Sequence, residues 1–572
     1  MVLLVSKLSV ANMKKVLSHK VIILLILIVV LGASLRFYHI TSVPVAMTGD
    51  ETAFGYNAFA IEKTLRDEHG QFLPLVFKSF GDYKVPLFVY FLAPLVKIFG
   101  LSEMVVRAPI ALFGTLLVVL VFLIAKKLFK SDLVALLSAL LLAISPWAIN
   151  FSRAGWEAMM AVFLFTLAVY LFLLSLEKIA WLSGSILFFM LSFYTYHAEK
   201  VSVPLLILAA YVLFRKKIKL SIKGHSIAII VLCLTALPAI IGITNVSGTS
   251  RARGSLITDY LYYSTKDVDY AATQNLVKDP SGPLKVIFLH SRLALSFTDI
   301  ASKFFAYLSP AELFVNGDPV GRHGAVDIGI LYTTDFLILL VSIYFYIRRQ
   351  KKDTDLFLII WLFLGLLPAM ITKDRIHGIR SLLAIPPLFI FEAWGLSQFL
   401  QVIKKRSKAI LLITVLVMVT TIGINFARFI QSYFIYTPIE RAGWWQYGYK
   451  QVVETVHDEQ NRFDKVVVDV PAVYGNPYIF FLFYQQFDPN LYNKTVSRQD
   501  DLVNKVVAVY SFYKYQFRQI FWPQDRLVRH VLYVGTDESI PKKDITDPTK
   551  FKLIREIPMP DGKIVFRIVE TL

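Results

Sequence analysis

The sequence contains a single cysteine, Cys233, among 572 residues. It therefore cannot form an intramolecular disulfide, and a metal site built from paired cysteines is excluded. Charged residues are also scarce, at 18% of the chain against 56% hydrophobic residues. Neither GxxxxGK[ST] nor GxGxxG occurs, so the sequence shows no nucleotide-binding loop. This composition is too apolar for a soluble protein and predicts a polytopic membrane protein.

Acidic residues are fewer than basic ones, 41 against 60, and the formal net charge is +19. The basic residues gather in short stretches between apolar runs, at 126–130, 215–219, 348–352 and 404–408. This pattern is typical of cytoplasmic loops, which carry an excess of Lys and Arg. We therefore expect the lipid bilayer as a partner and no nucleic acid.

Long apolar runs recur along the first 430 residues. A membrane-spanning helix needs about 20 mostly apolar residues. Eleven runs are expected to span, at 20–37, 105–125, 132–149, 156–176, 180–196, 200–214, 226–244, 327–347, 355–371, 381–400 and 409–430. The lysine-rich start precedes the first run without an A-x-A-like cleavage site, so we expect that run to be an uncleaved membrane helix.

The segment 85–100 is apolar but short, and Pro86, Pro94 and Lys97 interrupt it. If it crossed, the four basic clusters would lie opposite the basic N-terminus, against the positive-inside rule. We therefore predict an interfacial or re-entrant helix there. The expected fold is a polytopic α-helical membrane domain at 1–430, with outer loops at 38–104 and 245–326. An extracytoplasmic α/β domain is expected at 431–572, and the plasma membrane is the expected location.

The acidic pair Asp50–Glu51 directly follows the first span and precedes an amphipathic run, 52–66. Its apolar residues recur at helical spacing, which predicts a helix in the interface with Asp50 at its leading end. A simpler interpretation stays open. Thr48-x-x-Glu51 is also a capping box, and Asp50 then only favours the helix N-terminus.

Carboxylates and cations gather at the outer ends of the spans. Lys or Arg can neutralise a lipid phosphate, and a carboxylate can serve as general base for an acceptor hydroxyl. We predict Asp50 and Glu51 as catalytic residues. For the lipid phosphate and sugar we predict Lys84, Asp82, Tyr83, Arg107, Arg153, Glu157, Tyr196, His197, Arg375, His377 and Arg380.

Short motifs follow one another in a fixed order over residues 15–215. They are Gly49-Asp50-Glu51, Asp82-Tyr83-Lys84-Val85-Pro86, Arg107-Ala108-Pro109, Ser145-Pro146-Trp147, Trp156-Glu157 and Tyr194-Thr195-Tyr196. In this order they resemble the GT-C membrane glycosyltransferases of the protein O-mannosyltransferase and ArnT-like group. The resemblance is looser up to residue 430.

The resemblance implies an inverting glycosyltransferase that uses a polyprenyl-phosphate sugar and a protein, lipid or glycan acceptor. It implies that Asp50 is the base, that Glu51 supports it, and that Lys84 contacts the phosphate. In the ArnT-like branch an acid that takes part in a metal site directly precedes this lysine. Here Tyr83 stands there and the acid is Asp82, so we expect no certain cofactor and doubt a divalent metal at that place.

Several roles stay open on the residues alone. Arg153 and Glu157 lie one turn apart and could pair with each other, and His197 could cap a span. The aromatic clusters at 444–449 and 478–484 suit either a domain core or packing against the membrane domain. Two other functions also remain, a lipid or solute transporter and a lipid-linked glycan ligase or polymerase. The ligase or polymerase would rely on arginines and histidines and would not need the carboxylate of the first loop.

Overall fold

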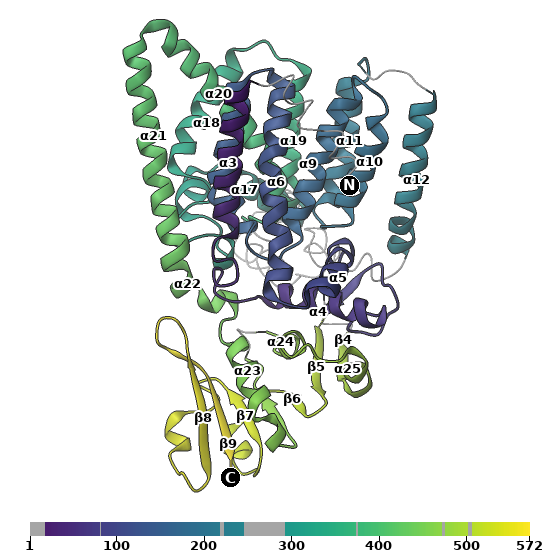
Figure 1. The fold of residues 1–572 in the computed structure, drawn as a ribbon, viewed down its shortest axis with the longest axis vertical. Coiled ribbons are helices and arrows are strands. Elements are labelled where there is room, and N and C mark those ends of the chain that lie inside the picture. Colours follow the sequence, from purple (N-terminus) through teal and green to yellow (C-terminus); the bar gives the residue numbers. More distant parts are fainter. Residues whose placement is uncertain are drawn as a thin grey trace, which may run out of the picture.

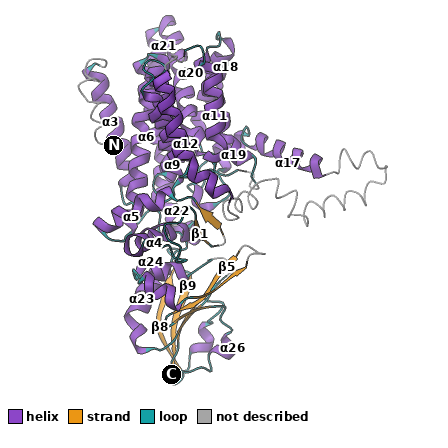
Figure 2. Ribbon diagram, turned by 90° about the vertical axis from the view of Figure 1, so that its right-hand side faces the viewer, coloured by secondary structure: helices purple, strands orange, loops and turns teal. Residues whose placement is uncertain are grey.

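The computed structural model describes residues 18–80, 82–217, 222–244, 292–372, 376–471, 475–501 and 506–572. Long helices form a bundle, and a strand-containing domain follows below it at the C-terminal end of the chain (Figure 1). Two short helices, α4 (Gly49–Thr64) and α5 (Leu87–Phe99), lie where these two parts meet (Figure 2).

Apart from α17, which falls in the predicted outer loop 245–326, the helices coincide with the apolar runs of the sequence. Their bounds are α3 (His19–Phe37), α6 (Glu103–Phe129), α7 (Asp132–Ile144), α8 (Pro146–Phe151), α9 (Ala158–Ser175), α10 (Trp181–Phe193), α11 (Glu199–Phe214), α12 (Ile222–Thr244), α17 (Arg292–Ala306), α18 (Thr333–Arg348), α19 (Asp353–Met370), α20 (Ile385–Arg406) and α21 (Lys408–Gln431). Serine side chains cap several starts, including those of α6 and α7. Such caps satisfy backbone N–H groups that have no partner in the first turn.

Each of the eleven predicted spans falls on one or two of these helices. By length and composition, six helices of the described residues are long and apolar enough to cross a membrane, and four shorter apolar helices accompany them. The chain is thus a multi-pass membrane protein, while the count of eleven crossings stays a prediction. Helix α5 has 13 residues. At about 1.5 Å per residue it is roughly 20 Å long, shorter than the ~30 Å hydrocarbon core of a bilayer.

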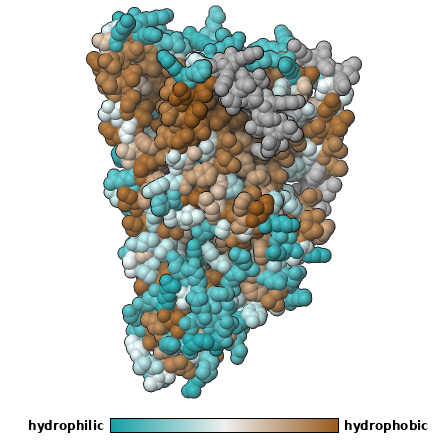
Figure 3. Space-filling view, in the orientation of Figure 1, coloured by the Kyte–Doolittle hydropathy of each residue, from teal (hydrophilic) through white to brown (hydrophobic). Residues whose placement is uncertain are grey.

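Apolar side chains cover much of the helical part, between a polar upper rim and the polar surface of the lower domain (Figure 3). Helix α21 shows this best, because its most apolar stretch has no buried residue. A long helix whose apolar side chains mostly stay outside the protein core is typical of contact with lipid.

The C-terminal domain is built on a seven-stranded sheet with strand order β4-β5-β6-β3-β7-β9-β8. The strand bounds are β3 (Val466–Val468), β4 (Ser497–Asp501), β5 (Val506–Phe512), β6 (Tyr515–Phe517), β7 (Leu532–Gly535), β8 (Phe551–Pro558) and β9 (Ile564–Thr571). Only β3 pairs in parallel, with β6 and β7. In the sequence, the apolar runs 465–469, 506–510, 531–534 and 564–569 predict strands, and 448–459 predicts a helix. These predictions are confirmed as β3, β5, β7 and β9, and as α23 (Tyr449–Glu459).

Strand β8 was not predicted, because its sequence alternates charged and apolar residues on an edge of the sheet. Strands β4 and β6 were missed as well. The first is polar throughout, and the second has only three residues. Strands β4 and β8 are the two edge strands of the sheet. An edge strand faces solvent, so its sequence lacks the apolar run of a central strand.

The C-terminal domain packs directly on α4. Helix α24 (Tyr478–Tyr484) lies against α4 at Gly55, where a Cβ atom would come within 2.5 Å of the Phe483 ring. The Glu68 carboxyl is buried in this contact and takes hydrogen bonds from Asn57 Nδ2 at 3.0 Å and Tyr478 Oη at 3.1 Å. Arg498 adds a hydrogen bond to the backbone carbonyl of Glu68 at 3.2 Å. The aromatic segment 478–484 therefore serves as the contact with the membrane domain.

Stability should depend on pH through Glu68. Burial raises the pKa of this carboxyl to about 7, from a usual value of 4.5. The neutral form is therefore favoured in the folded protein. The stability that it contributes is fully present below pH about 4.5 and is lost as the pH rises through about 7. We expect the melting temperature of Glu68→Gln in detergent to vary less between pH 5 and 8 than that of the wild type. Glu454→Gln, at an exposed site of the same domain, is the control, and equal pH profiles for Glu68→Gln and wild type would contradict the prediction.

The C-terminal domain and the basic loop before α19 should lie on opposite sides of the membrane. In a Cys233→Ala background, a membrane-impermeant maleimide added to intact cells should label Lys563→Cys and not Lys352→Cys. Both positions are exposed. Labelling of Lys352→Cys alone would reverse the predicted orientation.

Candidate functional site

The site is organised by the first turn of α4. Thr48 is the N-cap, and its Oγ1 accepts a hydrogen bond from the Glu51 backbone N–H at 3.4 Å. The Glu51 carboxylate in turn accepts from the Thr48 backbone N–H at 2.9 Å. The capping box read from the sequence is therefore present. It accounts for part of what Glu51 does, and it places Asp50 in the turn where a negative charge is stabilised by the helix dipole.

Glu51 is fully buried and its carboxylate is enclosed. Arg107 Nε lies 2.8 Å from Oε1, and Arg107 Nη2 donates to Oε2 at 3.3 Å. The backbone N–H of Gly155 also donates to Oε1, at 2.7 Å. All of these partners are internal groups of the protein. These contacts hold the start of α4 in place, and both Glu51 oxygens bind groups inside the protein.

Asp50 has the opposite environment. Its side chain is 42% exposed, and Oδ1 lies 2.7 Å from the Lys84 ammonium. Adjacent helical residues point about 100° apart, which explains how two neighbouring carboxylates reach such different surroundings. Asp50 is the carboxylate at this helix start that can meet a molecule from outside.

Lys84 comes from a short hairpin of β1 (Phe77–Ser79) and β2 (Asp82–Lys84). Its side chain is only 6% exposed. The ammonium lies over the rings of Phe54, 4.3 Å from the centroid, and Phe80, 5.5 Å from the centroid. Such cation–π contacts fix a lysine that reaches its counter-ion along an aromatic wall. The ammonium is therefore held beside Asp50.

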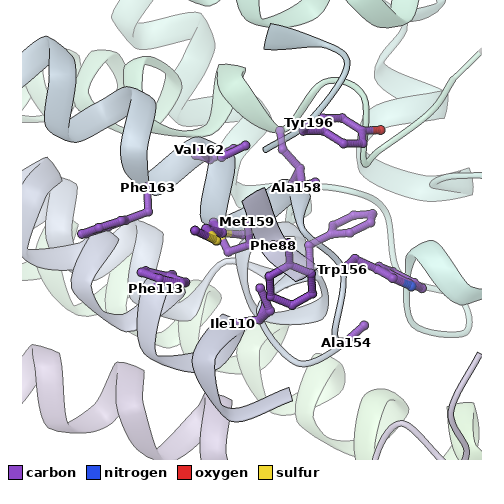
Figure 4. Close-up of a cluster of buried hydrophobic side chains, with 14 of the residues drawn as sticks. Phe88, Ile110, Phe113, Ala154, Trp156, Ala158, Met159, Val162, Phe163 and Tyr196 are labelled. Atoms are coloured by element: carbon purple, nitrogen blue, oxygen red, sulfur yellow. The ribbon is translucent and has the colours of Figure 1, made fainter. Parts of the chain in front are cut away.

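The neighbours of Lys84 on the hairpin have other surroundings. The backbone carbonyl of Tyr83 lies 2.9 Å from His197 Nε2, so this imidazole fastens the hairpin to the start of α11. The side chain of Asp82 lies outside the part of the chain that the structure describes. Tyr196 is buried at the edge of an apolar cluster, and Figure 4 shows Tyr196 and Trp156 on the same side of that cluster.

Arg107 and Arg153 both bind carbonyl groups of the first loop. Besides Glu51, Arg107 donates to the carbonyls of Ile40 and Pro44 at 3.0 Å. Arg153 donates to the carbonyls of Leu35 and Tyr38 at 2.6 Å. Both arginines are fully buried. Their observed partners give them a positioning role for the loop that precedes Asp50.

Glu157 is buried at the N-cap of α9. The described contacts of Arg153 are with carbonyl groups at 35–43 and with aromatic rings of the 432–436 segment. A pairing of Arg153 with Glu157 stays a prediction.

The late-chain candidates divide. Arg375 lies outside the described residues. Arg380 donates to Thr372 Oγ1 at 2.9 Å. His377 lies beside His323, with ring centroids 4.9 Å apart. The structure thus brings His377 to another histidine that the sequence placed 54 positions earlier.

Three contacts were not predicted from the sequence. Gln446 Oε1 accepts a hydrogen bond from the backbone N–H of Gly49 at 2.7 Å. Next to it, Trp445 stacks on Trp156, with ring centroids 5.4 Å apart and planes 8° apart. Trp156 Nε1 reaches Thr48 Oγ1 at 3.3 Å. The segment after α21 therefore completes the start of α4, and the tryptophan cluster at its head packs against the membrane domain.

Comparisons with known proteins agree with this arrangement. Residues 83–241 match the family model described as dolichyl-phosphate-mannose-protein mannosyltransferase. No significant match exists among curated protein sequences. The apo structure of ArnT from Cupriavidus metallidurans is similar with a TM-score of 0.51 and 10% identity, over 95% of this chain and 97% of that one.

The second similar structure is the archaeal oligosaccharyltransferase AglB from Archaeoglobus fulgidus, in complex with an inhibitory peptide and a dolichol-phosphate. Its TM-score is 0.50 at 14% identity, over 82% of this chain. The chain spans only 63% of the length of AglB. At such identities the likeness concerns the fold. The helical bundle, the position of α4 and α5 at its end and the appended strand domain are the GT-C fold of the ArnT- and protein mannosyltransferase-like membrane glycosyltransferases.

Proposed function

We propose that this protein transfers a sugar from a polyprenyl-phosphate donor to an acceptor hydroxyl, with inversion at the anomeric carbon. The observation that carries the proposal is the pair formed by Asp50 and Lys84. A half-exposed carboxylate at a helix start lies 2.7 Å from an ammonium that is otherwise buried. These are the two groups that the reaction needs, one for a proton and one for a phosphate charge.

In the proposed step the acceptor oxygen attacks the anomeric carbon from the face opposite the phosphate. The bond between that carbon and the phosphate oxygen breaks, and the hydroxyl proton passes to the Asp50 carboxylate. The leaving polyprenyl phosphate gains one negative charge. Lys84 lies where it can neutralise this charge, so its attraction grows as the bond breaks and favours the transition state.

The resting pair also gives the Lys84 side chain a partner before the donor arrives. A buried ammonium without a counter-ion is costly, and Asp50 supplies that counter-ion. A donor phosphate would compete with Asp50 for Lys84. Release from Lys84 leaves the carboxylate free to accept a proton, so donor binding and base activation are coupled in this geometry.

Glu51, Arg107 and Arg153 hold the frame in which this pair works. They connect the start of α4 to the first loop and to Gly155 through internal hydrogen bonds. The stacked rings of Trp156 and Trp445 are buried beside the N-cap of α4 and belong to the same frame. Arg375 and Arg380 remain proposed contacts of the lipid phosphate, and Asp82 remains a proposed contact of the sugar.

The comparisons support the donor class. The matching family model is described by its dolichyl-phosphate-mannose chemistry, and the similar AglB structure holds a dolichol-phosphate. We extend the polyprenyl-phosphate part of that description to this chain and leave the sugar open. The acceptor hydroxyl is proposed to lie on a protein, a lipid or a glycan at the outer face of the plasma membrane, where α4 meets the C-terminal domain.

Asp50→Asn should abolish turnover with little change in folding. Loss of a general base lowers a rate by about 10²–10⁴-fold. The assay incubates purified protein with a panel of radiolabelled polyprenyl-phosphate sugars and an acceptor extract, and follows sugar release from the lipid. Asp132→Asn is a matched control, because Asp132 also pairs with a lysine, Lys126, and is 43% exposed. Undiminished turnover in Asp50→Asn would instead favour a ligase that relies on arginines and histidines.

Lys84→Met should weaken donor handling. A hydrogen bond to a charged group contributes about 1.5–3 kcal/mol, so kcat/KM for the donor should fall at least roughly tenfold. The methionine keeps most of the apolar stem against Phe54. Lys126→Met is the control from the other pair, and kcat/KM for Lys84→Met equal to that of the control would remove Lys84 from the phosphate site.

A further inference from the structure

A second group of ionisable side chains lies near the site but outside the proposed step. Asp318 and His323 belong to the segment between η1 (Glu312–Asn316) and α18, and His323 ends the short helix η2 (Gly321–His323). His377 precedes η3 (Leu382–Ala384). One ligand atom from each of the three residues lies within 4.8 Å of the others. Two segments far apart in the chain thus converge on a carboxylate and two imidazoles.

This group is enclosed and held in place. The side chain of Asp318 is fully buried and that of His323 is 4% exposed. Asp318 Oδ1 accepts from the Val320 N–H at 2.8 Å, and Oδ2 accepts from the Gly378 N–H at 2.5 Å. The same Oδ2 lies 2.9 Å from His323 Nδ1. The carboxylate therefore ties the segment before α18 to the segment before η3.

The walls around the group are also fixed by specific contacts. Trp147 Nε1 donates to the Gly378 carbonyl at 3.0 Å, and the His377 N–H donates to Tyr307 Oη at 2.9 Å. The rings of Phe151 and Trp156 lie 5.3 and 5.8 Å from the His323 ring. Side chains packed in this way hold a set of ligands in a preorganised geometry.

The residue types and spacing suit a transition-metal ion. Zn²⁺ takes imidazole nitrogen and carboxylate oxygen at about 2.0–2.2 Å, which sets tetrahedral ligand atoms roughly 3.4 Å apart. Ligand atoms within 4.8 Å reach that spacing by small side-chain rotations. A buried carboxylate beside two imidazoles also gains a counter-charge when a divalent ion binds.

We propose that Asp318, His323 and His377 bind a divalent transition-metal ion of the Zn²⁺ class. Three protein ligands leave a fourth coordination position for water or for an oxygen of a bound molecule. The ion would fix the two segments to each other beside Trp156, whose indole reaches the N-cap of α4. This site is separate from the first-loop position at which the sequence made a metal doubtful, and it does not depend on which reaction the protein catalyses.

Metal binding can be measured without turnover. The full-length protein, purified in detergent without a histidine tag, is stripped with a chelator, exchanged into metal-free buffer and titrated with Zn²⁺ and with Co²⁺. We expect one equivalent of tightly bound Zn²⁺ by elemental analysis, a visible d–d absorption band of four-coordinate Co²⁺, and a higher melting temperature with Zn²⁺. Wild-type protein that retains less than a stoichiometric amount overturns the proposal.

The variants His323→Gln and His377→Asn should each lose the bound equivalent and the Co²⁺ band. His39→Gln removes an exposed imidazole near the same end of the bundle and should keep both. Asp318→Asn serves if either histidine variant fails to fold, because the amide keeps the shape of the side chain and one oxygen that accepts a backbone hydrogen bond. Retention of the metal in folded variants would assign the group to a plain hydrogen-bonded contact and reject the metal site. The sugar-release assay is independent, so failure here leaves the proposed transferase untouched.

Discussion

The ion pair between Glu51 and Arg107 is the interaction on which the site depends. Both side chains are fully buried, and Arg107 Nε lies 2.8 Å from Glu51 Oε1. Charges at such depth are costly unless each is paired and hydrogen-bonded, and removing one partner of a buried pair costs about 3–5 kcal/mol. Here the remaining hydrogen-bonding capacity is used by backbone groups of the first loop and by Gly155. The pair therefore joins α4, α6 and the first loop at one point.

This arrangement lets two adjacent carboxylates do different work. The observed partners of Glu51 are buried groups of the protein, and these contacts fix the backbone at the start of α4. Asp50 is half-exposed and lies beside Lys84, and in the proposed reaction its carboxylate exchanges this contact when a phosphate arrives. A general base must be held in position by its surroundings and must still be able to contact the substrate. The fixed contacts of Glu51 and the Asp50–Lys84 pair fit these two needs.

Much of this could be predicted from the sequence where the signal is local. Apolar runs placed the helices, because a span must satisfy its backbone within itself. The capping box placed the start of α4, and the 100° step between neighbouring residues separated Asp50 from Glu51.

Roles that depend on distant partners could not be predicted. The substrate contact predicted for Arg107 and Arg153 stays a prediction. Their hydrogen bonds to carbonyl groups more than 60 positions earlier in the chain have no signal in the local sequence. The sequence around Asp318 has no motif that predicts a site. Its contacts with Gly378 and His323 form only in the folded protein. Strand β8 could not be predicted for a related reason. Its sequence is rich in exposed charge, and it forms a strand because it pairs with β9.

The contact between Gln446 and Gly49 has a consequence for how the protein matures. The first N–H groups of a helix have no partner within the helix. That of Gly49 finds its acceptor in a residue synthesised 397 positions later. While the ribosome is still making the chain, α4 exists with this N–H open to water, and the start of the helix is completed only after α21 has been inserted and the segment behind it has docked. The order of synthesis thus keeps the site unfinished until nearly the whole membrane domain is in place.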